Sequence, residues 1–226
     1  MARSVIVTGA FGALGRVVAE AFADAGDKVA RIDFAKDAPS PLPGAIDIGG
    51  IDLTDEAATQ AALDKVVAAH GGIDVLVNIA GGFTWETVED GSIGAWAKMQ
   101  SMNLMTAATI SKLALPELVK GGESRIINMG AGAAVKAGTG MGAYAASKSG
   151  VHRLTEALAE ELAGKGVTVN AILPSIIDTP TNRADMPDAD HSQWVTPQRI
   201  ADVILFLASD ASHAVTGALI PVTRGG

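Results

Sequence analysis

Hydrophobic residues along the chain alternate between two patterns, short β-branched runs and longer stretches with helical spacing. The runs that predict strands are Ser4 to Thr8, Lys28 to Asp33, Ile46 to Leu53, Asp74 to Ile79, Arg125 to Met129, Gly166 to Ile172 and Leu219 to Val222. The stretches that predict helices are Leu14 to Ala25, Asp55 to His70, Trp96 to Lys120, Tyr144 to Ala163 and Pro197 to Ala208. This alternation is typical of parallel strands joined by crossover helices. We therefore expect an α/β fold, a doubly wound parallel sheet of about seven strands with helices on both faces.

Two stretches do not fit this alternation. Residues 81–90 form a polar segment that contains Phe83 and Trp85, and residues 175–196 form a longer one that contains Trp194. Both follow strands at the carboxyl edge of the predicted sheet, where open α/β sheets bind ligands. We expect them to wall a substrate pocket, with 175–196 as the substrate loop and the aromatic side chains placed to stack on a flat ring.

Composition narrows the class of protein. The chain has 226 residues, of which 48% are hydrophobic and 19% charged, and this suits one globular domain spanning residues 1–226. Lys and Arg number 17 against 25 Asp and Glu, a net charge of −8 without a basic run, so nucleic acid is not an expected partner. Since no apolar run suits a membrane span or a signal peptide, we expect a cytoplasmic protein without a membrane partner.

Metal and thiol chemistry are not expected. The chain contains no cysteine, which excludes disulfides and thiolate nucleophiles. Its four histidines are not spaced as metal ligands are. His152 is interpreted as a packing or surface residue.

A glycine-rich turn follows the first predicted strand and opens the first predicted helix. Glycines allow a backbone to approach a pyrophosphate, and the free N–H groups at a helix start attract its charge. The pattern predicts a dinucleotide site, although a tight turn that only packs helix on sheet would also need glycines. The candidate contacts in the turn, which begins at Thr8, are Gly9, Phe11, Gly12, Ala13, Leu14 and Gly15.

Asp33 ends the second predicted strand, near the position of an acid that binds the adenine ribose 2′-hydroxyl. A carboxylate there would repel a 2′-phosphate, whereas nearby Lys36 would attract one. We expect NAD, with NADH preferred over NADPH, because the carboxylate lies at the predicted contact itself.

Two further polar groups end strands at the same predicted edge. Asp52 and Leu53 end the third predicted strand, and the sequence Asn78-Ile79-Ala80-Gly81 ends the fourth. Of these, Asp52, Leu53, Asn78, Ala80 and Gly81 are candidate cofactor contacts. Alternatively, Asp52 is a loop acid beside Thr54, and Asn78 bonds the backbone.

Tyr144 and Lys148 are four residues apart in a predicted helix and therefore share one face. A tyrosine has an ordinary pKa of about 10 and is a weak acid–base catalyst until a nearby positive charge stabilises the phenolate. The pair predicts a tyrosine made acidic by a lysine, and the alternative is a surface tyrosine on a helix.

The order of these motifs resembles the short-chain dehydrogenase/reductase family across nearly the whole chain, with a Rossmann-type fold. The resemblance implies that Tyr144 transfers the substrate proton, while Lys148 lowers its pKa and holds the nicotinamide ribose. It implies that Asn103 anchors a water relay behind the lysine. It also implies contacts to the nicotinamide from Pro174, Ile177 and Thr179.

The sequence departs from the family pattern at three places. Ala13 stands where the family has the middle glycine of the turn, and a glycine, Gly12, lies one place earlier. Ser175 replaces the glycine that usually follows Pro174. Ala131 occupies the position of the usual catalytic serine. The rate of ketone reduction should therefore be low unless another hydroxyl, such as that of Thr139 or Ser147, replaces the missing one.

One branch of the family would account for these departures. Segments such as Gly12 to Gly15 and Asp178 to Pro180 resemble quinonoid dihydropteridine reductases, which also carry alanine in place of the serine. A quinonoid pterin accepts hydride into a conjugated ring, so no ketone oxygen needs a serine.

The function expected from the sequence is therefore an NAD(H)-dependent oxidoreductase that transfers hydride between nicotinamide and a small organic substrate. Quinonoid dihydropteridine reduction is the alternative within the family, and a dinucleotide-binding sensor or scaffold without turnover is the alternative outside it. The resemblance also implies a homodimer or homotetramer built through the two long helices.

Overall fold

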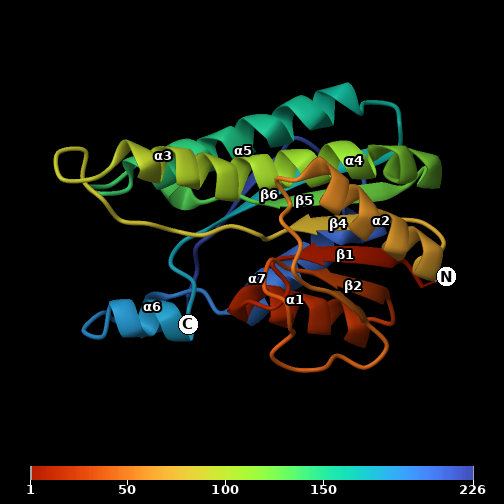
Figure 1. Cartoon of the computed structure of the whole chain (residues 1–226), viewed down its shortest axis with the longest axis horizontal. Coiled ribbons are helices and arrows are strands. Elements are labelled where there is room, and N and C mark those ends of the chain that lie inside the picture. Colours follow the sequence, from red (N-terminus) through yellow and green to blue (C-terminus); the bar gives the residue numbers. More distant parts are fainter. Residues whose placement is uncertain (1, 226) are drawn as a thin grey trace.

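The computed structural model of the chain describes residues 2–225 and contains one seven-stranded sheet (Figure 1). The strands are β1 (Ser4–Thr8), β2 (Lys28–Ile32), β3 (Ile46–Ile48), β4 (Val75–Asn78), β5 (Ser124–Met129), β6 (Val167–Pro174) and β7 (Leu219–Val222). Their order is β3-β2-β1-β4-β5-β6-β7, and each neighbouring pair is parallel. The chain order reverses between β1 and β4, which is the switch point where such sheets bind ligands.

Helices cover both faces of the sheet, as the sequence predicts (Figure 1). They are α1 (Ala13–Asp24), α2 (Glu56–His70), α3 (Ile93–Met99), α4 (Thr106–Gly121), α5 (Gly142–Glu161), α6 (Pro180–Asp185) and α7 (Pro197–Ala208). Helices α1 and α7 lie on one face, and α2, α4 and α5 lie on the other.

Strand β1 shows why two cores form. Val5 and Val7 point to one face and pack with Phe22 of α1, whereas Ile6 points to the other and packs with Leu63 of α2. Successive strand residues face opposite sides of a sheet, so a strand covered on both sides is apolar throughout. The resulting scaffold fixes the carboxyl end of β1 at the switch point.

The third predicted strand is too long. It was expected to reach Leu53, but β3 ends at Ile48, because the chain turns at Gly49 and Gly50. Gly50 has φ of +74°, a conformation that favours glycine, and its N–H donates to the carbonyl O of Ala35. Asp52 and Leu53 therefore lie in a loop and not at a strand end.

The long helix predicted from Trp96 to Lys120 is also wrong in detail. It begins earlier, at Ile93, and a π-helical turn, η1 (Gln100–Met105), separates α3 from α4. Such a turn inserts one extra residue into a helix and is common at functional sites. Periodicity at helical spacing does not reveal it.

The predicted loop at residues 175–196 is partly helical. It contains α6 and a short 3₁₀ turn, η3 (His191–Gln193), and an isolated parallel bridge joins Ile177 to Val195. Thr179 caps α6 by accepting a bond from the N–H of Asn182 at 3.2 Å, and Pro180 takes the first helical position. None of the helices among residues 2–225 is long and apolar enough to cross a membrane.

Candidate active site

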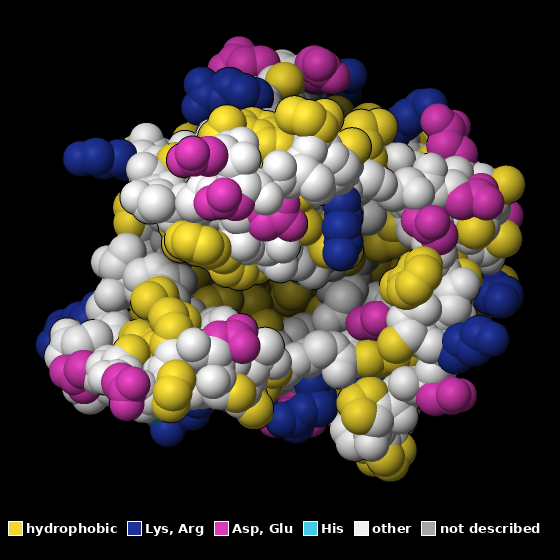
Figure 2. Space-filling model, turned by 60° about the vertical axis from the view of Figure 1, so that its left-hand side comes forward, with side chains coloured by type: hydrophobic (Ala, Val, Ile, Leu, Met, Phe, Trp, Pro, Cys, Tyr) yellow, Lys and Arg dark blue, Asp and Glu magenta, His cyan; other side chains and the backbone are white. Residues whose placement is uncertain are grey.

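A cleft of about 860 Å³ opens at the carboxyl edge of β1, β2 and β4, and Figure 2 shows hydrophobic side chains in a hollow on this side of the molecule. This volume lies in the range of small-molecule and cofactor sites. The predicted cofactor contacts that line it are Gly9, Phe11, Gly12, Ala13, Leu14, Gly15, Asp33, Asp52, Leu53, Ala80, Gly81 and Thr179.

The glycine turn allows close packing at two points. Gly9 has φ of +64°, and a Cβ there would lie 2.9 Å from Cα of Ala80. A Cβ on Gly15 would overlap the carbonyl O of Gly9. Gly12 is the N-cap of α1, so the first N–H groups of that helix face the cleft without an intrahelical partner. The turn fits a bound pyrophosphate, and Ala13 is accommodated because it takes the first helical position.

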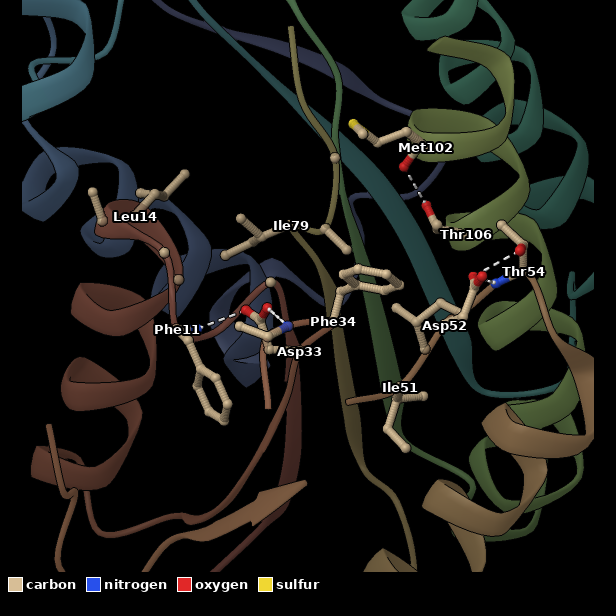
Figure 3. A pocket seen from close by; sticks show the side chains of 18 of the residues that line it. Phe11, Leu14, Asp33, Phe34, Ile51, Asp52, Thr54, Ile79, Met102 and Thr106 are labelled. Carbon is tan, nitrogen blue, oxygen red and sulfur yellow. Dashed lines mark hydrogen bonds between the residues drawn. The ribbon is translucent and has the colours of Figure 1, made fainter. Parts of the chain in front are cut away.

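Asp33 is held beside this turn (Figure 3). One carboxylate oxygen accepts from the N–H of Phe11 at 2.9 Å, and the other accepts from the N–H of Ala35 at 2.9 Å. The Phe11 ring is buried, with the guanidinium of Arg31 5.5 Å from its centroid. The carboxylate is therefore fixed in the cleft wall, with its charge in place for a ribose hydroxyl.

Thr8 joins the ends of β1 and β4. Its hydroxyl oxygen accepts from the N–H of Ile79 at 3.0 Å and from the N–H of Ala80 at 3.1 Å. These bonds hold the segment that forms the back of the cleft.

Two predicted contacts have other bonds. Asn78 is buried outside the cleft lining, and its amide donates to Ser111 at 3.0 Å and to Asn128 at 2.8 Å. Asp52 lines the cleft, but its carboxylate accepts from the hydroxyl and N–H of Thr54, and these bonds lower its pKa. Asp52 thus matches the alternative of a loop acid beside Thr54, whereas Asn78 bonds two side chains and not the backbone.

The π-helical turn points Asn103 inward. This residue is 1% exposed, and its amide bonds both ways with Gly82, accepting from the N–H at 2.9 Å and donating to the carbonyl at 3.1 Å. The same amide donates to Ser147 of α5 at 2.9 Å, and Ser147 donates to the carbonyl O of Tyr144 at 2.7 Å. Ser147 is therefore fully engaged and cannot replace the missing serine, while Thr139 lies on an exposed loop.

Lys148 lies next to this network. It is 4% exposed, and its Nζ lies 3.6 Å from the point where a Cβ on Gly81 would stand, at the cleft wall. Its Nζ donates to the carbonyl O of Met129 at 2.8 Å. Burial lowers the pKa of Lys148 to about 8.

Tyr144 is half-buried, and its ring meets that of Phe83 edge to face, with centroids 4.9 Å apart. Burial raises the pKa of Tyr144 to about 12. This direction is opposite to the lowering expected from the Lys148 ammonium, and its cause is the burial of the phenol. At neutral pH the phenol is therefore protonated.

The aromatic residues of the two predicted pocket walls differ. Phe83 and Trp85 are 53% and 58% exposed, and the Trp85 indole covers Gly140, just before α5. Trp194 is only 5% exposed and packs against His191. Trp194 is thus a core residue and is not available to stack on a ligand.

The residues predicted to contact the nicotinamide also differ in their access to the cleft. Thr179 lines the cleft, whereas Pro174 is buried at the end of β6 and Ile177 pairs with Val195. Ala131 is 5% exposed and directly precedes the 3₁₀ turn η2 (Gly132–Ala134).

About half of the residues that line the cleft were not predicted from the sequence. Lys98, Ser101 and Met102 belong to one helical face at i, i+3 and i+4, a spacing that packing alone also explains. The lining residues that were not predicted are Phe34, Ala35, Asp37, Pro39, Ile51, Thr54, Ile79, Lys98, Ser101, Met102, Thr106 and Thr181.

Comparisons with known proteins agree with this geometry. The model of the family described as short chain dehydrogenase matches residues 3–190. The chain is 31% identical to a 3-oxoacyl-[acyl-carrier-protein] reductase of Thermotoga maritima, covering 97% of this chain and 96% of that protein. It is 32% identical to D-threitol dehydrogenase of Mycolicibacterium smegmatis, covering 97% and 91%.

Solved structures show the same fold. Aldohexose dehydrogenase of Thermoplasma acidophilum, in ligand-free form, superposes with a TM-score of 0.88 at 29% identity, covering 98% of this chain and 92% of that one. Carveol dehydrogenase of Mycobacterium avium, in complex with NAD, superposes with a TM-score of 0.86 at 27% identity, covering 99% of this chain and 96% of that one. The names of these relatives span different substrates, so they do not select one. The family match, the shared fold and the glycine turn identify the chain as a member of the short-chain dehydrogenase/reductase family and an oxidoreductase of that type.

Proposed function

We propose that this protein uses NADH to reduce a small, flat, conjugated organic substrate, with Tyr144 as the proton donor. The observation that carries the proposal is one cluster: Lys148 and the Asn103 amide meet at Gly81 and Gly82, on the wall of the cleft that the glycine turn opens. The cleft proposed to hold the dinucleotide and the lysine of the proposed tyrosine–lysine pair thus lie at one edge of the sheet.

The cofactor preference rests on Asp33. Bound nicotinamide dinucleotide would supply the hydride, its pyrophosphate against the turn at Gly9 to Gly15 and its adenine ribose beside Asp33. Because the Asp33 carboxylate is fixed by two backbone N–H groups, it cannot move away from a 2′-phosphate without losing both bonds. The NAD complex of carveol dehydrogenase supports this cofactor class.

The proton step rests on Tyr144, which remains a phenol at neutral pH with a pKa of about 12. A phenol can donate a proton to the atom that hydride transfer leaves negative, whereas oxidation needs the phenolate. Reduction is therefore the favoured direction near pH 7, and oxidation should speed up as pH rises. Lys148 would hold the nicotinamide ribose and favour the phenolate, and Asn103 would support a water relay behind it.

The substrate class rests on Ala131, Phe83 and Trp85. Ala131 offers no hydroxyl for a ketone oxygen, and the Ser147 hydroxyl is already engaged. The exposed side chains of Phe83, which contacts Tyr144, and of Trp85, which covers Gly140, suit stacking on a flat ring. A quinonoid dihydropterin fits both features, since its conjugated ring spreads the charge that hydride brings.

Turnover measurements distinguish among these candidate functions. NADH consumption is followed with quinonoid dihydropterin, with a quinone and with an aliphatic ketone. We expect the two conjugated rings to react and the ketone to react slowly. Firm NADH binding without turnover of any of them would support the alternative, a dinucleotide sensor or scaffold.

The cofactor assignment has its own test in the variant Asp33→Asn. Fluorescence titration should show NADH binding at least about tenfold more tightly than NADPH in the wild type, and nearly equal affinities in the variant. Asp24→Asn, which removes a charge at the exposed end of α1, should keep the wild-type ratio. Equal affinities in the wild type would refute the role of Asp33.

We also propose that copies of the chain assemble as a homodimer or homotetramer. Large apolar side chains are exposed along α3, η1 and α4, among them Ile93, Trp96 and Met105. Burying such a row against a second copy would remove it from water. Light scattering of the purified protein tests this, and a monomeric mass would contradict it.

A further inference from the structure

The segment that follows β5 is anchored to α5 although it carries no catalytic hydroxyl. Lys148 Nζ donates to the carbonyl O of Met129 at 2.8 Å, and Ser149 Oγ donates to the carbonyl O of Ala134 at 2.9 Å. These two bonds fix the ends of the stretch that surrounds Ala131. Its middle is held by a third side chain of the same helix.

That side chain is His152, one helical turn beyond Lys148. The N–H of Ala131 donates to Nε2 of His152 at 3.4 Å, and His152 is only 3% exposed. Gly130 makes the approach possible, since a Cβ there would lie 2.6 Å from that Nε2. Because a backbone N–H is always a donor, Nε2 must carry a lone pair, which requires the neutral imidazole protonated at Nδ1.

We propose that neutral His152 is a positioning residue that fixes the backbone of Gly130 and Ala131 and, through it, the Met129 carbonyl that orients Lys148. The catalytic part of this inference rests on the proposed function, while the structural part does not. It differs from the sequence-level interpretation of His152 as a packing or surface residue.

Protonation of His152 would reverse this arrangement. Nε2 would become a donor facing the donor N–H of Ala131, and the bond would be lost. Burial, the largest cause, lowers the pKa of His152; the positive charges of Arg153 and Lys148 also lower it, and the negative charge of Glu156 raises it. Since the folded state favours the neutral ring, the fold loses stability as pH falls below the ordinary value of 6.5, and the anchor itself is lost as pH falls further, through the lowered pKa of His152.

Two substitutions distinguish the role of the His152 hydrogen-bond acceptor from the role of its side-chain volume. His152→Gln keeps an acceptor that does not titrate, and His152→Leu removes the acceptor. His213→Gln, which removes an exposed histidine after α7, serves as the control. Backbone amide hydrogen exchange is measured for residues 129–134 at pH 7.5 and pH 4.5 and corrected for intrinsic rates; the lower pH is about two units below the ordinary histidine pKa, because burial lowers the pKa of His152.

We expect exchange in residues 129–134 of the wild type and the control to be about fivefold faster at the lower pH. His152→Gln should show no such change, and His152→Leu should exchange fast at both pH values. In turnover assays the acid loss of kcat should follow the same order. Unchanged wild-type exchange, or the same acid response in His152→Gln, would overturn the inference even if His152→Leu fails to fold. The exchange arm needs no substrate, so it stands or fails independently of the proposed reaction.

Discussion

At the scale of single residues, Ala131 distinguishes this chain from the usual family pattern. It has extended backbone, with φ of −160°, and its N–H is bonded to His152, so the position is rigid but lacks a donor side chain. One correctly placed donor at an oxyanion is worth several kcal/mol in related chemistry. The loss should therefore restrict the substrates and leave the cofactor site intact.

Ala131→Ser is the corresponding prediction. We expect reduction of an aliphatic ketone to rise by about tenfold, because a hydroxyl returns to the position that the family pattern gives to its catalytic serine. Initial rates of NADH consumption check this. Ala133→Ser, on the adjacent 3₁₀ turn, should give no gain, and an unchanged ketone rate in Ala131→Ser would show that the hydroxyl is not limiting.

For single residues, the sequence predicted which residues line the cleft better than it predicted their hydrogen-bond partners. Asp33 and the glycine turn lie on the cleft as predicted, since their roles depend on neighbours in the chain. The partners of Asn78 and Lys148 come from β5 and from α4, which are distant in the sequence, and no local pattern contains them. The pKa of Tyr144 follows burial, which depends on packing by Phe83.

At the scale of elements, the contact between η1 and α5 organises the site. Asn103 in η1 and Ser147 in α5 are 1% and 0% exposed, and one hydrogen bond of 2.9 Å joins them. The Ser147 hydroxyl passes this link to the backbone at Tyr144. The π-helical turn is thus tied directly to the helix that carries the tyrosine and the lysine.

Ser147→Ala tests this link. It leaves a buried donor on Asn103 without one of its partners, so we expect the free energy of unfolding to fall by about 1–3 kcal/mol. Urea denaturation measures the change. Ser175→Ala, at an exposed position after β6, should change it by less than about 0.5 kcal/mol. Equal effects of the two substitutions would count against the link.

Elements themselves were predicted where the pattern was long or regular. The seven strands and five main helices follow from the alternation of β-branched runs and helical spacing, because strands that helices cover on both faces form short, mostly apolar runs. The early end of β3, the π-helical turn and α6 were not predicted. Each depends on a glycine turn, an extra residue or a cap that hydrophobic spacing does not encode.

For the whole molecule, function and stability conflict at Lys148. Its ammonium is buried, and the pKa of about 8 means that the folded state disfavours the charge. Between this value and the ordinary 10.5, the unfolded chain binds the proton and the folded chain does not. This group alone therefore makes the fold more stable as pH rises through that window.

Lys148→Met should consequently stabilise the protein while abolishing turnover. We expect the free energy of unfolding at pH 7 to rise by about 1 kcal/mol, a net value that allows for the lost bond to Met129. The gain should shrink as pH approaches 10, where wild-type Lys148 is neutral, and denaturant titrations across this range would follow it. A variant less stable than the wild type at pH 7 would contradict the sign.

The most direct test of the central claim uses NADH carrying deuterium at C4 of the nicotinamide, with quinonoid dihydropterin as acceptor. We expect deuterium to appear in the reduced pterin and turnover to slow relative to unlabelled NADH. Tyr144→Phe should still bind NADH but reduce a quinone at least about a hundredfold more slowly. A wild-type protein that binds NADH yet transfers no deuterium to any conjugated ring, or a Tyr144→Phe variant with wild-type rates, would contradict that claim.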